Sequence, residues 1–119
     1  MTMDEVRALV AELPEAVESA HHNHPDFRVR KKIFATLWPP KNRCNLRLPG
    51  AEAHALINTE PDKYSLISDR DPIAWVAADL EHCEPNELRE LLASAWQLVA
   101  PPALSAALEE EAQGNTAVP

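Results

Sequence analysis

The chain has only two glycines among its 119 residues, and this scarcity excludes one class of site. Loops that cradle nucleotide phosphates need several glycines close together, because only glycine lets the backbone approach the phosphate closely. No nucleophile elbow or paired-cysteine centre is present either. We therefore expect a protein that is not an enzyme and carries no cofactor.

Cysteine is equally scarce. Cys44 and Cys83 are the only two, and no C-x-x-C spacing occurs, which argues against a zinc site and a thioredoxin-type redox centre. A free cysteine most often behaves as a small buried apolar side chain. We expect this of Cys44, which alternates with Leu46 and Leu48.

Aromatic residues make up only 5% of the chain. Aromatic side chains bury large areas and dominate the packing of small cores. Trp75 and Trp96 are therefore interpreted as core anchors.

Long apolar runs are absent. No stretch approaches the roughly 18 to 20 apolar residues that a membrane-spanning helix needs. Residues 1–15 carry charges and lack the apolar region of a secretory signal. We expect one monomeric cytoplasmic domain over 1–112, without membrane contact, followed by a disordered tail over 113–119.

Positive charge is scarce overall and concentrated in one segment. The formal net charge is -8, which taken alone disfavours binding to nucleic acid. Of the 11 Lys and Arg residues, seven nevertheless fall between positions 28 and 47, with no Asp or Glu among them. They are Arg28, Arg30, Lys31, Lys32, Lys41, Arg43 and Arg47. Because salt screens charges more than about 10 Å apart, such a local basic surface can attract a polyanion despite the acidic remainder.

Two periodicities predict an α+β fold in which helices flank a central antiparallel sheet. Apolar residues recur at helical spacing in three segments: 2–13, 51–58 and 85–100. Strand-forming residues, several of them alternating polar and apolar, occupy five segments: 16–20, 27–30, 33–38, 43–48 and 73–80. Short connections join the first three or four strands into an antiparallel meander with one face exposed to water. The segment 61–72 is interpreted as a polar loop.

Several stretches taken together resemble the MmcQ/YjbR family. They are His22-Asn23-His24-Pro25-Asp26-Phe27-Arg28-Val29, Lys32-Ile33-Phe34-Ala35-Thr36-Leu37-Trp38, the strand from Trp75 to Leu80, and Ala95-Trp96-Gln97-Leu98-Val99-Ala100-Pro101. The likeness covers about positions 3–104. It implies a frataxin-like two-layer sandwich with a central antiparallel meander, and a DNA-binding surface of the double-wing type.

The sequence departs from this family pattern in two places. The tight turn before the strand that begins at Lys32 often carries glycine, whereas this chain has Arg30 and Lys31. The Val-Ala-Pro sequence near the end is often followed by a basic residue, whereas Pro102 stands here. The second departure removes one positive charge from the implied DNA-binding surface.

The basic segment is the main candidate for a functional site. In the predicted meander, four arginines point outward and three lysines lie at two hairpin turns. Such cations bind phosphates, and Trp38 adds base stacking if it lies on the same face. We expect weak, non-specific, salt-sensitive binding to double-stranded DNA, because no helix is evident to read bases. The alternatives are a solvated sheet face and a surface that binds an acidic protein.

Two histidines and an aspartate form a second candidate. On a strand, His22, His24 and Asp26 share one side, and imidazole and carboxylate groups are ligands of zinc. Asn23 and Pro25, however, predict a bend that separates the three groups. We therefore predict no metal site.

Overall fold

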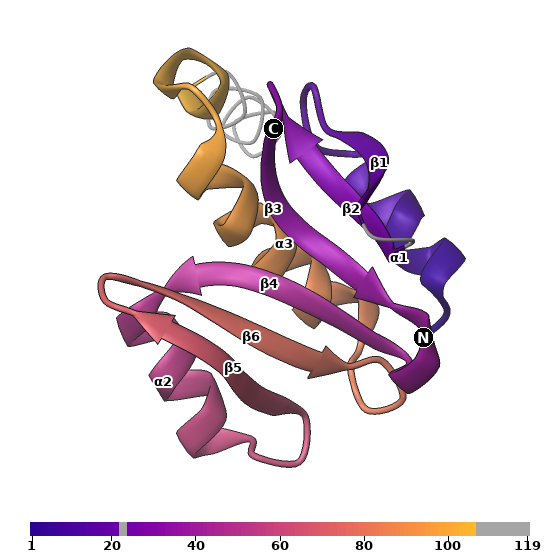
Figure 1. Ribbon diagram of the computed structural model, residues 1–119, viewed down its shortest axis with the longest axis vertical. Helices are drawn as coiled ribbons and strands as arrows, with labels where there is room; N and C mark the ends of the chain where they lie inside the picture. Colours follow the sequence, from indigo (N-terminus) through magenta and orange to yellow (C-terminus); the bar gives the residue numbers. More distant parts are fainter. Residues whose placement is uncertain (22–23, 107–119) are drawn as a thin grey trace, which may run out of the picture.

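The computed structural model describes residues 1–21 and 24–106. Within them the chain forms a two-layer sandwich, with helices behind one six-stranded antiparallel sheet (Figure 1). The strands are β1 (Val17–His21), β2 (His24–Val29), β3 (Lys32–Trp38), β4 (Arg43–Pro49), β5 (Tyr64–Arg70) and β6 (Ile73–Asp79). The helices are α1 (Met3–Val10), α2 (Gly50–Thr59) and α3 (Pro85–Val99), with a short 3-10 turn, η1 (Pro39–Lys41). The α+β fold predicted from the sequence is confirmed, whereas the tail over 113–119 lies outside the described residues.

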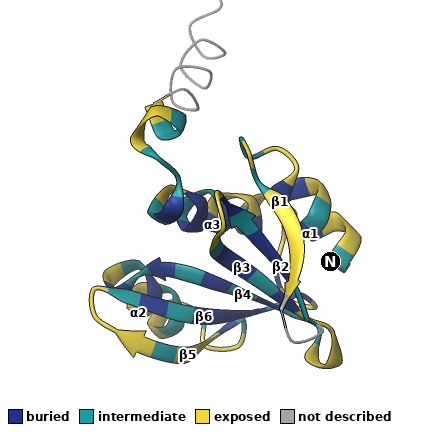
Figure 2. Cartoon of the chain, turned by 45° about the horizontal axis from the view of Figure 1, so that its top comes forward, coloured by how far each residue is buried: buried dark blue, intermediate teal, exposed yellow. Residues whose placement is uncertain are grey.

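The sheet order is β1-β2-β3-β4-β6-β5, so the first four strands form the predicted meander. Every neighbouring pair is antiparallel. Figure 2 shows that buried residues concentrate in the central strands and in α3, while β1 and β5 lie exposed at the edges. None of the described helices combines the length and the apolar character needed to cross a membrane.

Helix α1 begins at a capping box. The Thr2 hydroxyl accepts a hydrogen bond from the Glu5 N–H at 3.1 Å, and the Glu5 carboxylate accepts one from the Thr2 N–H at 3.0 Å. The inner side of the helix buries Val6, Leu9 and Val10 in the single core. These contacts fix α1 against α3.

Helix α3 carries the largest buried side chain. Trp96 is 0% exposed, and its indole N–H donates to the Pro14 carbonyl oxygen at 2.9 Å. Pro14 lies in the loop after α1, so this bond joins two segments that are distant in sequence. The interpretation of Trp96 as a core anchor is confirmed.

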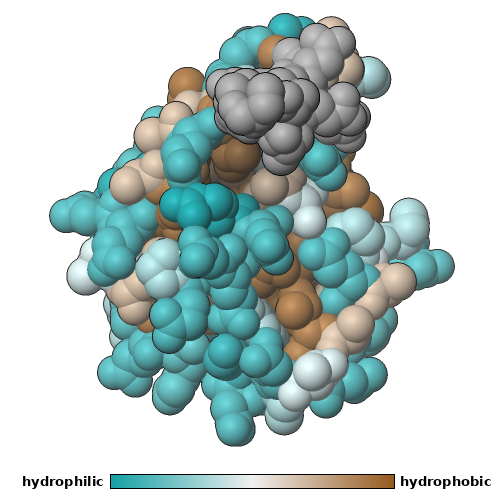
Figure 3. Space-filling model, turned by 180° about the vertical axis from the view of Figure 1, so that it is seen from behind, coloured by the Kyte–Doolittle hydropathy of each residue, from teal (hydrophilic) through white to brown (hydrophobic). Residues whose placement is uncertain are grey.

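From outside, the helix side of the molecule is largely hydrophilic (Figure 3).

The segment 61–72 is not the predicted loop, because it contains the edge strand β5. Tyr64 is the only buried residue of β5, so the alternation that identifies a strand is missing from its sequence. A register shift between Leu66 and Ser68 marks a bulge in the pairing with β6. Leu66 and Ile67 are exposed there.

The β2–β3 turn holds two residues in the left-handed region. Arg30 has φ 48° and Lys31 has φ 73°, at the turn where the family often carries glycine. Positive φ at both central residues is typical of the tight hairpin turn that favours Asn-Gly. A side chain in this region costs roughly 1–2 kcal/mol, so the turn is strained.

Replacing Lys31 with glycine is expected to raise the free energy of unfolding by about 1 kcal/mol and the melting temperature by about 4 °C. The control is Lys32→Gly, which removes the same charge from the first residue of β3. Glycine in a strand costs about 0.5–1 kcal/mol, so this variant should melt lower than the parent. Thermal unfolding followed by circular dichroism measures both, and equal shifts in the two variants would contradict the strain.

Candidate nucleic-acid interface

The face of the sheet opposite the helices has no covering element in the described part of the chain (Figure 1). Strand β4 determines what this open face carries. Its alternate residues Cys44, Leu46 and Leu48 are buried toward the helices, as predicted. The intervening residues Arg43 and Arg47, with Asn45 between them, therefore point to the open face.

Strand register brings other open-face residues beside these arginines. Arg43 lies opposite Trp38 on β3 and Asp79 on β6, and Arg47 lies opposite Trp75 on β6. The row between them is made of smaller side chains, namely Thr36, Asn45 and Ala77. The Asn45 amide donates to the Thr36 hydroxyl at 3.1 Å. The open face thus has a low middle row between two rows that each carry an arginine and a tryptophan.

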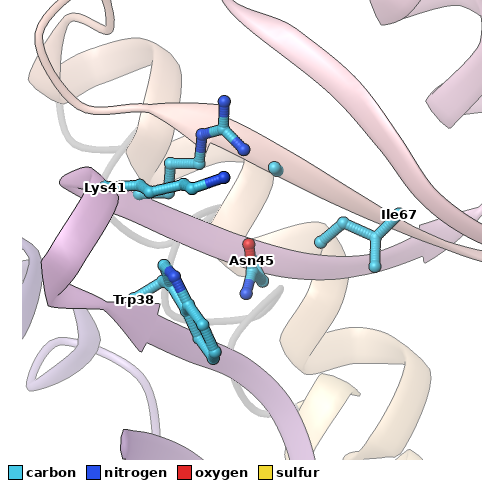
Figure 4. Close-up of a pocket in the computed structure, with 6 residues that line it drawn as sticks. Trp38, Lys41, Asn45 and Ile67 are labelled. Carbon is cyan, nitrogen blue, oxygen red and sulfur yellow. The ribbon is translucent and has the colours of Figure 1, made fainter.

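Three hollows lie on this open face, and the third shares lining residues with each of the other two. The first, about 290 Å³, is lined by Trp38, Lys41, Arg43, Asn45, Ile67 and Ala77 (Figure 4). The second, about 340 Å³, is lined by Ile33, Arg47, Arg70, Ile73 and Trp75. A third, about 320 Å³, lies between them and is lined by Ile33, Thr36, Asn45, Ile67 and Trp75. Because they share residues, we treat them as one shallow trough, called the open-face trough below.

Two of the seven predicted cations are neutralised by carboxylates. The Arg28 guanidinium donates to both oxygens of the fully buried Asp26, at 2.8 and 3.0 Å. Arg30 donates to both oxygens of Glu15, at 3.2 and 3.1 Å. Hydrogen bonds from Arg30 lower the pKa of Glu15, and those to Asp26 raise the pKa of Arg28. The charge of each of these two arginines is therefore balanced by a neighbouring carboxylate and is not free to bind a ligand.

The other five predicted cations divide between the two ends of β3. Lys31 and Lys32 lie at the β2–β3 turn, whereas Lys41 lies in η1 after the opposite end of β3. A seven-residue strand is about 20 Å long, so the lysines do not form one cluster. The structure therefore brings together Lys41, Arg43 and Trp38 at one end of the trough, with Arg47 at the other.

Among the trough residues that sequence reasoning missed, Trp75 and Arg70 add an aromatic ring and a positive charge. Trp75 is not a core anchor: it is half-buried on the open face, while its neighbours Ala74 and Val76 are buried. Strand β6 is apolar on both faces from Ile73 to Ala78. Its sequence therefore has no polar–apolar alternation that would show which face is exposed to solvent. Arg70 belongs to β5, which was interpreted as a loop, and it lines the trough beside Arg47.

The histidine candidate takes a different role. The ring of His24 stacks on Trp38, with centroids 3.9 Å apart and planes at 28°. Both oxygens of Asp26 accept hydrogen bonds from Arg28, so this carboxylate is paired with a guanidinium group. His22 lies outside the described residues. His24 therefore supports an aromatic side chain at the edge of the trough.

One further group of possible metal ligands lies near the trough. Single atoms of Asp79, Glu81 and His82 lie within 4.8 Å of one another. Burial alone would raise the pKa of Asp79, but hydrogen bonds from His82 and the Glu81 N–H, with the charges of His82 and Arg43, lower it. Hydrogen bonds from His82 and from the Glu81 N–H hold the Asp79 carboxylate in place. These bonds account for the closeness of the three residues without a metal ion.

Both cysteines are free and buried. Burial raises the pKa of Cys44 to about 12, so its thiol stays protonated at neutral pH. Burial also raises the pKa of Cys83, which lies beside Tyr64. The expectation that Cys44 faces the core is confirmed.

These features define an α+β sandwich whose sheet is covered by helices on one side and bears aromatic and cationic side chains on the other. The chain belongs to the YjbR family, because the family model matches residues 11–98. The crystal structure of Deinococcus radiodurans protein DR2400, which carries the domain DUF419, has a similar fold with a TM-score of 0.74. It is 21% identical over 92% of this chain and 86% of that chain. No curated protein matches the chain with significant similarity.

Proposed function

We propose that the chain is a non-enzymatic YjbR protein that binds nucleic acid without sequence specificity through the open-face trough. The observation that carries this proposal is that the four cations lining the trough have no carboxylate within 4.0 Å among the described residues. These cations are Lys41, Arg43, Arg47 and Arg70. The ion pairs of the described residues lie elsewhere, for example at Arg28, Arg30 and Arg89.

Unpaired cations on an otherwise acidic protein favour a phosphate ligand. Arginine binds phosphate oxygens with two parallel hydrogen bonds, and the trough holds three arginines. The positive charge is local, while the net charge of -8 repels polyanions elsewhere on the surface. The orientation of a bound strand should therefore follow the trough, and its affinity should depend strongly on salt.

The first test is a salt titration with a labelled 20-nucleotide probe of mixed sequence, followed by fluorescence anisotropy. Four phosphate contacts predict that the affinity falls about 50- to 150-fold between 50 and 200 mM salt. The double variant Arg43→Gln/Arg47→Gln should weaken binding by about tenfold or more at 50 mM salt and make the salt dependence shallower.

The matched control is Arg30→Gln/Arg89→Gln, which removes the same total charge from two exposed arginines that already pair with Glu15 and Glu12. Its affinity should stay within about twofold of the parent. Equal loss in both double variants would contradict a localised site, as would a lack of binding at 50 mM salt. Tighter binding of polyglutamate than of the oligonucleotide would instead favour an acidic protein as the partner.

A further inference from the structure

We propose that the nucleic acid bound in the open-face trough is single-stranded, with bases stacked on Trp38 and Trp75 and phosphates held by the flanking cations. This inference rests on the proposed function, and it replaces the duplex expected from the sequence. Trp38 is 37% exposed and Ile67 is 52% exposed, and Ile33 and Trp75 are half-buried beside them.

Accessible aromatic and branched side chains that are flanked by cations fit unpaired bases and not a duplex. A duplex keeps the faces of its bases stacked inside, so it offers an open sheet only phosphates, sugars and groove edges. The indoles would then lose water without gaining a stacking partner. Bases of a single strand present free faces, and aromatic side chains on a sheet bind them by stacking.

The charges and the rings are arranged along one path. Lys41 and Arg43 flank Trp38 at one end of the trough, and Arg47 and Arg70 flank Trp75 at the other. From about 3.3 Å per residue and about 4.8 Å between strands, the two tryptophans lie about 16 Å apart. At about 3.4 Å per nucleotide, that distance spans about five stacked nucleotides, and fewer if the strand is extended.

The indole at the first end is already held in position. His24 stacks on one face of Trp38, and the same indole lines the first hollow of the trough (Figure 4). A preorganised ring loses less conformational entropy when a base stacks on it. Between the two rings, Asn45 donates to Thr36, so this amide hydrogen bond is used within the protein. The trough therefore favours stacking over reading of base edges, and we expect little sequence preference.

The test compares one 20-nucleotide strand with its own duplex at 50 mM salt, by anisotropy and by tryptophan emission. We expect the single strand to bind at least tenfold more tightly and to quench the emission, because two of the three tryptophans lie in the trough. Trp38→Leu and Trp75→Leu should each weaken single-strand binding by about tenfold and change duplex binding by less than twofold. Among oligonucleotides of increasing length, affinity should rise to about five nucleotides and then level off.

A second variant protects the test from a folding defect. Ala77→Leu enlarges a side chain in the middle row, replaces neither an indole nor a charged residue, and should weaken single-strand binding several-fold. The inference is overturned if the duplex binds as tightly as the single strand or more tightly. It is also overturned if thymidine monophosphate alone binds as tightly as the single strand. If only the arginine double variant loses affinity while the tryptophan and Ala77 variants do not, the inference fails and the proposed function stands. If neither form of nucleic acid binds, both fail.

Discussion

Replacing Trp96 with alanine is expected to lower the free energy of unfolding by about 3–5 kcal/mol, the usual cost of removing a buried aromatic side chain. The substitution leaves a cavity between α3 and the rest of the core, because the indole is 0% exposed. It also leaves the Pro14 carbonyl oxygen without its donor. At about 4 °C per kcal/mol, the melting temperature should fall by about 12–20 °C. Thermal and urea unfolding followed by circular dichroism measure the change.

Two controls separate the contributions to this loss. Trp96→Phe keeps most of the buried volume and removes the indole N–H, so it should cost about 1–2 kcal/mol. Trp38→Ala makes the same substitution as the main variant, but at an indole that is 37% exposed. It should shift the melting temperature by only a few degrees. Similar losses at Trp38 and Trp96 would show that the core is not organised around α3 as described.

The second large effect is expected at Asp26, the one fully buried charged side chain among the described residues. Asp26→Asn keeps the shape but weakens two charge-assisted hydrogen bonds from Arg28, and should cost about 2 kcal/mol of unfolding free energy. The variant also releases Arg28 from its carboxylate. Nucleic-acid affinity should therefore stay the same or rise while stability falls.

This combination distinguishes a structural ion pair from a binding residue. Urea unfolding gives the stability, and anisotropy with the single-stranded probe gives the affinity. The control Glu15→Gln weakens the exposed pair with Arg30, and it should change neither quantity much, because exposed ion pairs contribute little. A loss of affinity in Asp26→Asn, measured well below its unfolding transition, would instead place Arg28 in the interface in its paired state.

The fold could be predicted largely from the sequence, since alternation and helical spacing report burial directly. Cys44, Leu46 and Leu48 alternate with polar residues, and the strand they predict is β4. The prediction missed β5, because an edge strand that buries only Tyr64 has no alternation to detect. A local sequence pattern identifies a strand through its buried side chains, and β5 has almost none.

The candidate site could be predicted only in part, because its composition depends on pairing across the sheet. The sequence identified Lys41, Arg43 and Arg47 as candidates. Alternation places Asp26 and Arg28 on the same face, but it could not show that Asp26 is fully buried or that both of its oxygens accept hydrogen bonds from Arg28. Trp75 was assigned to the core for a related reason: its strand is apolar on both sides, and only the register with Arg47 places it on the open face.

The bulge in β5 has a consequence for how the molecule behaves in a concentrated solution. An edge strand with exposed Leu66 and Ile67 would ordinarily be a template on which another chain could add a strand and begin a fibril. The bulge between Leu66 and Ser68 breaks the regular row of backbone donors and acceptors at that point. Leu66 and Ile67 can thus remain exposed to solvent without offering a straight edge for growth.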